Sequence, residues 1–261
     1  MSLLALRGIT RSFYGVQALA GVSFEVQAGT VTGLIGPNGA GKTTLFNVIS
    51  GLLKPNAGTI AFDGRDITGW RPDCVSAAGL VRTFQVARGF PRLSVRENLM
   101  LYAPDQPGEH LLTALARGRR GLRRERELSG AAARIAERLA LDAVLDQPAA
   151  ALSGGQKKLL ELGRALMARP RLVLLDEPAA GVNPSLAMTL AGHISALARD
   201  GTSFLVIEHD MALVERLCDP VIVMTEGSRL IEGSFAAVRA DRRVQEAYLG
   251  VRAGAFLRGA S

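Results

Sequence analysis

The segment Gly36–Pro37–Asn38–Gly39–Ala40–Gly41–Lys42–Thr43 has residue types and spacing suited to holding phosphate, and it fits the pattern G-x-x-x-x-G-K-[ST]. The glycines let the backbone curl so that its N–H groups point inward, and a helix that starts near Lys42 adds its positive dipole end. Lys42 can reach the β- and γ-phosphates of a nucleotide, and the Thr43 hydroxyl can bind Mg²⁺. A glycine-rich turn that only caps a helix is the weaker alternative, because a strand-like run and a helical run flank the segment. The expected nucleotide-binding residues are Gly36, Pro37, Asn38, Gly39, Ala40, Gly41, Lys42, Thr43 and Thr44.

A second site for chemistry lies at residues 172–177, where an apolar run ends directly in Asp176 and Glu177. Many strands exit into charged turns, so this pattern is a weak indication by itself. After a phosphate-binding loop, however, we expect such a strand to run beside that loop, because open α/β sheets bind ligands at the carboxyl ends of their strands. Asp176 would then hold Mg²⁺ through a water molecule, and Glu177 would polarise the attacking water as general base.

Hydrophobic patterns predict the elements that position these residues. The expected strands are 31–35, 58–64, 172–175, 203–207 and, as the final strand, 221–224. The expected helices are 43–53, 130–141, 155–168, 185–198 and 211–217. This alternation predicts an α/β fold with a mainly parallel sheet and helices on both faces. Residues 86–151 are rich in Ala, Leu and Arg, and we interpret them as a helical insertion within a single domain over residues 1–261.

The composition is that of a folded globular protein, with 48% hydrophobic residues among 261. No apolar run approaches the roughly 18 to 20 residues that a membrane-spanning helix needs. Residues 1–10 lack an extended apolar core and a cleavage site, so we interpret them as a first strand rather than a signal peptide. Cys74 and Cys218 lack the spacing of metal ligands, and we expect them to be small apolar side chains in a reducing compartment.

A net charge of +7 raises the question of a nucleic-acid partner. Six arginines are clustered in one stretch: Arg117, Arg119, Arg120, Arg123, Arg124 and Arg126. Few aromatic side chains are interleaved with them, whereas single-stranded nucleic acid is bound by aromatic stacking. We therefore interpret the stretch as a solvated face, with proximity to an anionic membrane surface as the alternative, and expect no nucleic-acid partner.

The segment Leu152–Ser153–Gly154–Gly155–Gln156 has the form of the signature of ATP-binding cassette (ABC) proteins, and it precedes the acidic pair as in that family. The chain resembles ABC ATPases over nearly its whole length. The resemblance implies that Ser153 and Gly155 contact the γ-phosphate of ATP held by the opposite subunit, and it adds Gln156 to the nucleotide-binding set. A near copy, residues 128–131, lacks the second glycine and the glutamine, and we treat it as unrelated to the signature.

The resemblance also assigns residues outside these motifs. Gln85 resembles the glutamine that senses Mg²⁺ and water, and His209 resembles the switch histidine that contacts the γ-phosphate. Tyr14 resembles the aromatic residue that stacks on adenine, with Phe13 as the competitor. Asn183 stands where many members have aspartate, and this departure puts in doubt the communication between two ATP sites.

The fold implied by the resemblance is a P-loop NTPase of RecA type, with an antiparallel β subdomain and an inserted α-helical subdomain. ATP and Mg²⁺ are the implied cofactors, with Thr43, Gln85 and Asp176 at the metal. The implied catalytic residues are Glu177, His209 and Gln85. Two ATP molecules would be clamped between two cassettes, each by the phosphate loop of one chain and the signature of the other.

At finer grain the chain resembles the ATPase subunits of branched-chain amino-acid uptake transporters. This resemblance is carried by residues 64–69, 81–85, 177–184, 207–211 and 247–250, and by the Arg-rich extension. ATPases for urea or amide uptake and for lipopolysaccharide export share much of the pattern and stay as alternatives. A repair or translation ATPase would need coiled-coil insertions or tandem cassettes, and a P-loop kinase has no need of the signature.

The implied partners are transmembrane permease subunits, a second ATPase subunit (a second copy or a paralogue) and, indirectly, a solute-binding protein. The implied location is peripheral, on the cytoplasmic face of the inner membrane.

Overall fold

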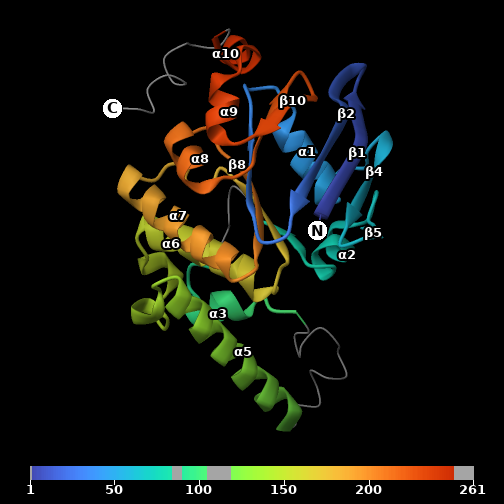
Figure 1. Cartoon of the computed structure of the whole chain (residues 1–261). Coiled ribbons are helices and arrows are strands. Elements are labelled where there is room, and N and C mark those ends of the chain that lie inside the picture. The colour runs from blue at the N-terminus through green and yellow to red at the C-terminus, as the bar shows by residue number, and fades with distance from the viewer. Residues whose placement is uncertain (1, 84–89, 105–118, 250–261) are drawn as a thin grey trace. The chain divides into compact units, whose positions relative to one another are not determined.

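A computed structural model of the chain describes residues 2–83, 90–104 and 119–249 (Figure 1). The chain divides into two compact units. The first combines Met1–Arg82 with Arg171–Ser261, and the second is Thr83–Pro170. The second unit extends further along the chain than the helical insertion expected at residues 86–151.

A six-stranded sheet forms the centre of the first unit. Its strands are β3 (Val31–Ile35), β6 (Leu80–Arg82), β7 (Leu172–Asp176), β8 (Ser203–Ile207), β9 (Val221–Thr225) and β10 (Ser228–Gly233). Their order is β10-β9-β3-β8-β7-β6, and every neighbouring pair is parallel except β10 and β9. Strands β3, β7 and β8 are buried throughout, as apolar strands covered on both faces should be. The mainly parallel sheet is confirmed, but residues 221–224 are not the final strand, because β10 follows and pairs antiparallel.

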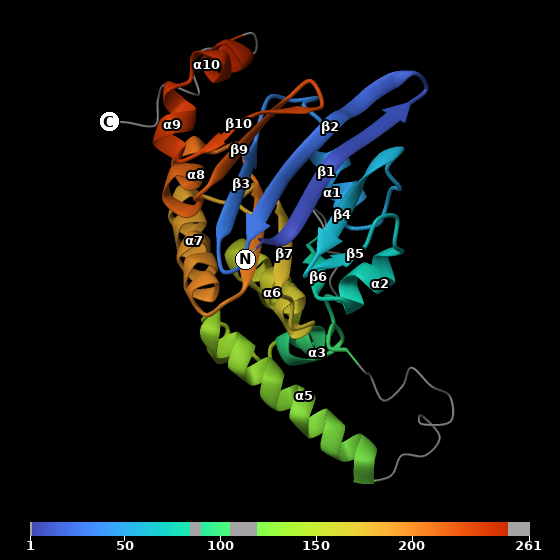
Figure 2. The same ribbon diagram turned by 45° about the vertical axis from the view of Figure 1, so that its right-hand side comes forward.

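A smaller, four-stranded antiparallel sheet completes the strands of this unit. It contains β1 (Ser2–Phe13), β2 (Val16–Gln27), β4 (Ala57–Phe62) and β5 (Arg65–Asp66), in the order β2-β1-β4-β5. The long hairpin of β1 and β2 and the shorter β4 beside it are visible in Figure 2. Residues 2–10 therefore lie in a strand, as predicted.

Within its described residues, the first unit has six helices that pack around these sheets. They are α1 (Lys42–Ile49), α2 (Pro72–Ala77), α7 (Pro184–Arg199), α8 (Met211–Leu217), α9 (Phe235–Ala240) and α10 (Arg242–Leu249). Phe46 of α1 belongs to one buried cluster with Leu6 of β1 and Leu174 of β7, so α1 is shared by the cores of both sheets. Helices α7 and α8 lie on the other face of the large sheet (Figure 2). The α/β architecture with helices on both faces follows from this arrangement.

Helix α1 ends before the position that its apolar spacing predicts. It stops at Ile49, whereas the sequence pattern continues to Leu53. Gly51 has a φ of 77°, which is left-handed, and a Cβ there would lie 2.4 Å from the carbonyl oxygen of Trp70. Glycine is the residue that tolerates such a close approach and such a conformation, so it terminates the helix here.

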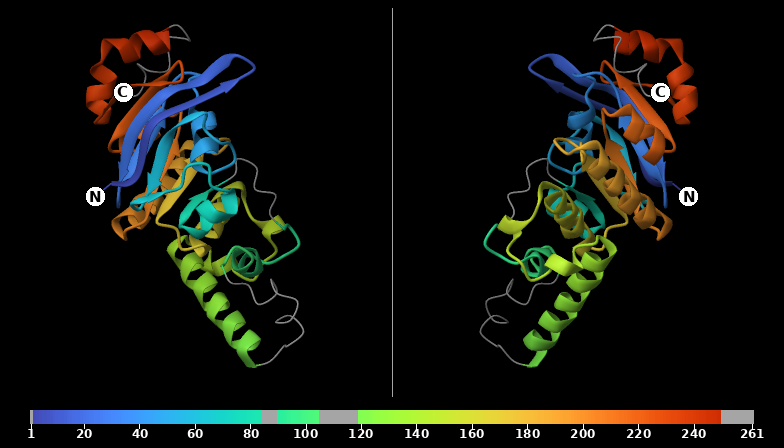
Figure 3. Two further views of the ribbon diagram at one scale, coloured as in Figure 1. Left: turned by 90° about the vertical axis from the view of Figure 1, so that its right-hand side faces the viewer. Right: turned by 90° about the vertical axis from the view of Figure 1, so that its left-hand side faces the viewer.

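The second unit is helical. It contains α3 (Val95–Met100), α5 (Arg119–Arg138), α6 (Gly154–Met167) and two short 3-10 helices (Asp142–Val144 and Ala149–Ala151). Helices α3, α5 and α6 pack against one another in pairs, and Figure 3 shows them from two sides. At Gly163 of α6 an added Cβ would lie 2.8 Å from Cδ2 of Leu99, so glycine permits the close approach of α6 to α3.

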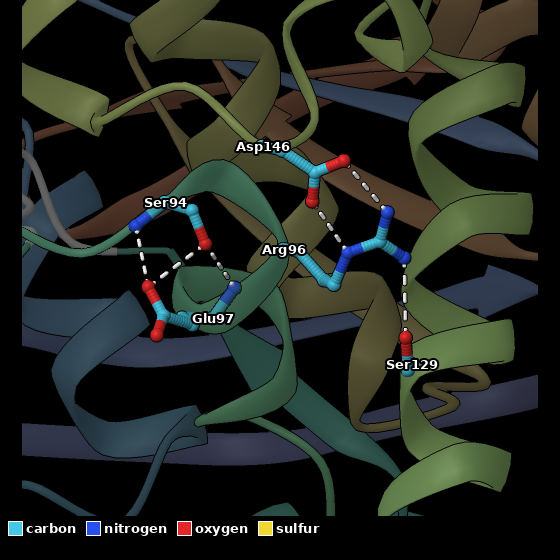
Figure 4. A network of polar contacts seen from close by, with 5 residues as sticks. All are labelled: Ser94, Arg96, Glu97, Ser129 and Asp146. Carbon is cyan, nitrogen blue, oxygen red and sulfur yellow. Dashed lines mark hydrogen bonds and ion pairs between the residues drawn. The ribbon is translucent and has the colours of Figure 1, made fainter.

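Polar contacts fasten the start of α3 to its neighbours in this unit (Figure 4). Ser94 and Glu97 form a capping box, in which the Ser94 hydroxyl and the Glu97 carboxylate each accept a backbone N–H. The Arg96 guanidinium donates to both carboxylate oxygens of Asp146, at 2.7 and 3.1 Å, and to the hydroxyl of Ser129 at 3.1 Å. Ser129 lies well inside α5, where its hydroxyl binds an arginine. The near copy of the signature at residues 128–131 therefore does not begin a helix.

The two cysteines differ in exposure. Cys218 is buried, as expected for a small apolar side chain, but Cys74 is exposed, so that expectation is wrong for Cys74. Burial raises the pKa of the Cys218 thiol to about 12, so this thiol stays protonated at neutral pH.

In the Arg-rich stretch, Arg123 is exposed and pairs with Glu127 one turn along α5, at 3.1 Å. Exposed pairs of this kind contribute about 0.3–0.5 kcal/mol, which fits a solvated helix face.

Candidate nucleotide-phosphate site

The loop that joins β3 to α1 bends through conformations that favour glycine. Gly36, Gly39 and Gly41 have φ values of 152°, 82° and 94°. A Cβ atom on Gly36 would lie 2.2 Å from the carbonyl oxygen of Met224, and one on Gly41 would lie 2.5 Å from that of Ala18. These two positions therefore exclude any side chain. The backbone has the curl that a cradle for phosphate oxygens requires.

Helix α1 presents its N-terminus to this loop. The helix begins at Lys42, no side chain caps it at Gly41, and its first turn contains no acidic residue. Its first N–H groups have no partner within the helix, and with the helix dipole they favour an anion. Lys42 Nζ donates to the carbonyl oxygens of Gly36 at 2.7 Å and Pro37 at 3.0 Å. The ammonium group therefore lies over the loop, where a nucleotide phosphate would meet it.

The acidic pair lies near the same ammonium group. Asp176 ends β7 and is buried, and Glu177 follows it with a φ of 49°. Burial lowers the pKa of Lys42, and the charges of Glu177 and Asp176 oppose that shift. The structure thus brings all three groups together. In the sheet β8 lies between β3 and β7, so the acidic pair follows the second strand from the one that enters the loop.

The oxygen donors beside the loop fit a magnesium ion. Mg²⁺ prefers carboxylate, hydroxyl and phosphate oxygens. Thr43 and Thr44 lie in the first turn of α1, and Asp176 supplies a carboxylate. The Arg82 guanidinium donates to Oδ2 of Asp176 at 2.9 Å and also donates to Oδ1 of Asn47. Because both members of the Arg82–Asp176 pair are nearly buried, the ion pair holds the aspartate side chain in a fixed orientation.

The segment after β8 brings a histidine to the acidic pair. His209 Nδ1 lies 3.8 Å from Oε1 of Glu177 and 4.0 Å from Oε2 of Glu208. The His209 side chain is 70% exposed, so a ligand can reach it. Glu208, by contrast, is only 2% exposed, and burial raises the pKa of its carboxyl group. The site therefore contains one more acidic group than the sequence predicts.

The signature residues begin helix α6 in the second unit. Ser153 is the N-cap: its hydroxyl accepts a hydrogen bond from Gln156 N, and Gln156 Oε1 accepts one from Ser153 N. An added Cβ on Gly154 would meet nothing within 4 Å, whereas Gly155 is buried. This helix start is open at Gly154 and has no acidic residue in its first turn, so it suits an anionic ligand.

Two of three further predicted residues lie in the part of the chain that the structure describes. Tyr14 lies at a φ of 48° in the turn between β1 and β2 and is fully exposed, so its ring is available for stacking. Asn183 is the N-cap of α7, where its side chain accepts from Leu186 N at 2.9 Å. Asparagine caps a helix about as well as the aspartate that many members carry. Gln85 lies outside the described residues.

A contact from the C-terminal helix is a feature that the sequence did not predict. The side chain of Tyr248, in α10, lies beside the backbone of Gly36, the first residue of the phosphate loop. Burial raises the pKa of the Tyr248 hydroxyl, so it stays protonated at neutral pH. The only signal in the sequence is the resemblance of residues 247–250, which gives no position in space.

Two profiles of known protein families match most of the chain. A family profile described as ABC transporter matches residues 19–180. A second profile, described as branched-chain amino acid ATP-binding cassette transporter, matches residues 232–254. The first match contains the phosphate loop, the signature and the acidic pair, and the second contains Tyr248.

Individual relatives extend over nearly the full length. The "Probable branched-chain amino acid transport ATP-binding protein LivG" of Archaeoglobus fulgidus is 39% identical over 252 residues, with 97% of each chain covered. The high-affinity branched-chain amino acid transport ATP-binding protein BraF of Pseudomonas aeruginosa is 37% identical, with 95% of this chain and 98% of BraF covered. A solved structure described as the ADP conformation of an ATP-binding cassette of an ABC transporter has a TM-score of 0.84 and 40% identity, covering 96% of this chain and 99% of that one.

Proposed function

Because the chain belongs to the ABC transporter family, we propose that it is the ATP-hydrolysing subunit of a transporter that takes up branched-chain amino acids. One observation carries the ATPase part: Lys42, Asp176, Glu177 and His209 converge beside a glycine loop at a bare helix N-terminus. The solute class rests on relatives of 36–40% identity that are named as branched-chain amino acid transport ATP-binding proteins.

ATP binding is proposed for the loop and the start of α1. The N–H groups of the loop and of the first turn surround the phosphates, and Lys42 contacts the β- and γ-phosphates. The relative solved in an ADP conformation supports a nucleotide at this place. Tyr14 would stack on the adenine ring. The proposed binding residues are Tyr14, Gly36, Pro37, Asn38, Gly39, Ala40, Gly41, Lys42, Thr43 and Thr44.

Hydrolysis is proposed for the groups at the carboxyl ends of β7 and β8. Thr43, Gln85 and Asp176 would hold Mg²⁺, which neutralises charge on the phosphate oxygens when bound. Glu177 would accept a proton from the attacking water, and His209 would donate a hydrogen bond to the γ-phosphate. Lys42 and His209 would share the charge that develops in the transition state.

The signature of a second subunit completes the pocket in this proposal. Ser153, Gly155 and Gln156 at the start of α6 would face the γ-phosphate held by the partner subunit. The open N-terminus of α6 supports such a ligand. Two subunits, identical or paralogous, would then enclose two ATP molecules and separate after hydrolysis.

The remaining partners follow from the transport role. Among the described residues, no helix is long and apolar enough to cross a membrane. Transmembrane permease subunits would therefore provide the path for the solute, and a solute-binding protein would deliver it. The chain would lie on the cytoplasmic face of the membrane, where ATP is available.

We expect the chain to support uptake of leucine, isoleucine and valine. The test is to purify the chain with its membrane partners, reconstitute them in vesicles and measure ATP-dependent uptake of labelled leucine. Labelled urea and a short amide are the matched control solutes. Leucine uptake that requires ATP and this chain supports the proposal. Uptake of urea or amide without leucine would contradict the solute class, and no ATP hydrolysis at all would contradict the ATPase assignment.

A further inference from the structure

Glu208 is a buried carboxylate that none of the proposed steps uses. It follows β8 directly and precedes His209, and it is 2% exposed. Burying a carboxylate is costly unless several donors satisfy it. The neighbours of this side chain should therefore explain why it is buried here.

The donors come from two separate segments of the chain. The backbone N–H of Ala179 donates to Oε1 of Glu208 at 3.0 Å, and that of His209 donates to Oε2 at 3.2 Å. The backbone N–H of Asp210 lies near the same carboxylate and favours its charged form. Ala179 lies just after Glu177, whereas His209 and Asp210 follow β8. One side chain thus ties the segment with the proposed general base to the segment with the switch histidine.

The backbone of the segment that contains Glu177 has to be held in place by hydrogen bonds from its surroundings. Glu177 has a φ of 49°, and residues with a side chain adopt this region only where their surroundings enforce it. Its N–H donates to the carbonyl oxygen of Ile207 at 2.9 Å, and its carbonyl oxygen accepts from Ala180 at 3.0 Å. The hydrogen bond from Ala179 N to Glu208 is a third bond to the same turn. Because Ile207 and Glu208 are consecutive, two of these three bonds come from the end of β8. The end of β8 therefore fixes the backbone from which Glu177 projects.

The chemistry of the donors explains why the residue is glutamate. The hydrogen bonds that the carboxylate accepts come from backbone N–H groups, and an ionised carboxylate has two oxygen acceptors and no donor. A glutamine of the same shape would turn an NH₂ group toward one of the N–H groups, so that two donors would meet. An aspartate would keep both acceptors but is one methylene shorter. Both the reach and the acceptors are therefore specific to glutamate.

We propose that Glu208 is a positioning residue for hydrolysis, because it fixes Glu177 and His209 relative to each other while remaining out of contact with the phosphates. This inference rests on the proposed ATPase function. Effects of about 100-fold are typical when a reacting group is displaced by about 1 Å.

The test is Glu208→Gln, assayed for ATP hydrolysis and for nucleotide affinity. We expect kcat to fall roughly 10- to 100-fold, because Glu177 is no longer held in place. The Kd of a fluorescent ATP analogue should stay within about threefold, because the loop and Lys42 are untouched. The Ala179 amide should also exchange its hydrogen faster than in the wild type, since its acceptor is weakened.

The matched control is Ser203→Ala, on the same strand at the end away from the site. Ser203 is buried, and its hydroxyl accepts from Gly29 N at 2.9 Å, so the variant loses a partly buried hydrogen bond of β8. We expect it to lower the melting temperature while leaving kcat within about threefold of the wild type. A kcat for Glu208→Gln equal to the wild type, or a fall in kcat that Ser203→Ala reproduces, would overturn the proposal.

If Glu208→Gln does not fold, Glu208→Asp replaces it. This variant keeps the charge and both acceptor oxygens, but its shorter side chain cannot reach both segments, so kcat should still fall with nucleotide affinity preserved. Wild-type kcat in this variant would overturn the proposal. A wild-type protein that does not hydrolyse ATP would instead refute the proposed function.

Discussion

In Glu177→Gln, ATP should bind with near wild-type affinity while hydrolysis falls at least about 100-fold, because a positioned general base contributes typically 10²- to 10⁴-fold. The glutamine keeps the size of the side chain but cannot accept a proton from water. Lys42 and the loop, which are proposed to hold the nucleotide, are unchanged. Phosphate release under saturating ATP and the Kd of a fluorescent ATP analogue measure the two effects separately.

The control for this variant is Glu215→Gln, which makes the same chemical change on the exposed face of α8. It should leave both hydrolysis and affinity unchanged. If Glu177→Gln kept wild-type turnover, the assignment of the general base would be wrong. Loss of ATP binding together with turnover would show that Glu177 supports the loop rather than the reaction.

Lys42→Ala should weaken ATP binding itself. The ammonium group lies over the loop, 2.7 and 3.0 Å from two of its carbonyl oxygens, and no other side chain in the first turn of α1 carries a positive charge. Charge-assisted hydrogen bonds contribute about 1.5–3 kcal/mol each, so affinity should fall roughly 10- to 100-fold. Titration with a fluorescent ATP analogue measures this fall.

Lys54→Ala provides the matched control, because Lys54 is exposed and lies in the loop after α1. Its affinity for ATP should equal that of the wild type. Equal affinity in Lys42→Ala and the wild type would place the phosphates elsewhere. A loss of the folded state, seen as a large fall in the melting temperature of Lys42→Ala, is not expected, because the lysine is only partly buried.

The parts of the fold that the sequence predicts are those whose patterns are local. Residues 31–35, 172–175 and 203–207 are short, mostly apolar runs, and all of them are buried strands in the central sheet. Strand β10 was missed because residues 228–233 mix charged and apolar side chains and are only partly buried. The end of α1 was placed too late because the backbone at Gly51 outweighs the apolar spacing.

In the candidate site, too, the sequence predicts the local motifs but not the contacts between distant segments. The phosphate loop and the acidic pair each lie in one short segment, so their residue types and order could be read directly. Arg82 and Asp176 are 94 residues apart in sequence, and Glu208 and Ala179 are 29 apart. These contacts depend on which strands become neighbours in the sheet, and no local pattern specifies that. The positioning groups therefore became visible only in three dimensions.

The most direct test of the account is the mass of Glu177→Gln in solution with ATP and Mg²⁺, measured alone and with its membrane partners. We propose that each nucleotide pocket is complete only with the signature of a second subunit. The ATPase subunit should therefore be a dimer with ATP bound and a monomer with ADP bound. Adding Ser153→Arg should abolish the pairing, since a bulky side chain then fills the helix start. An ATPase that stays single with ATP in both preparations would contradict the account.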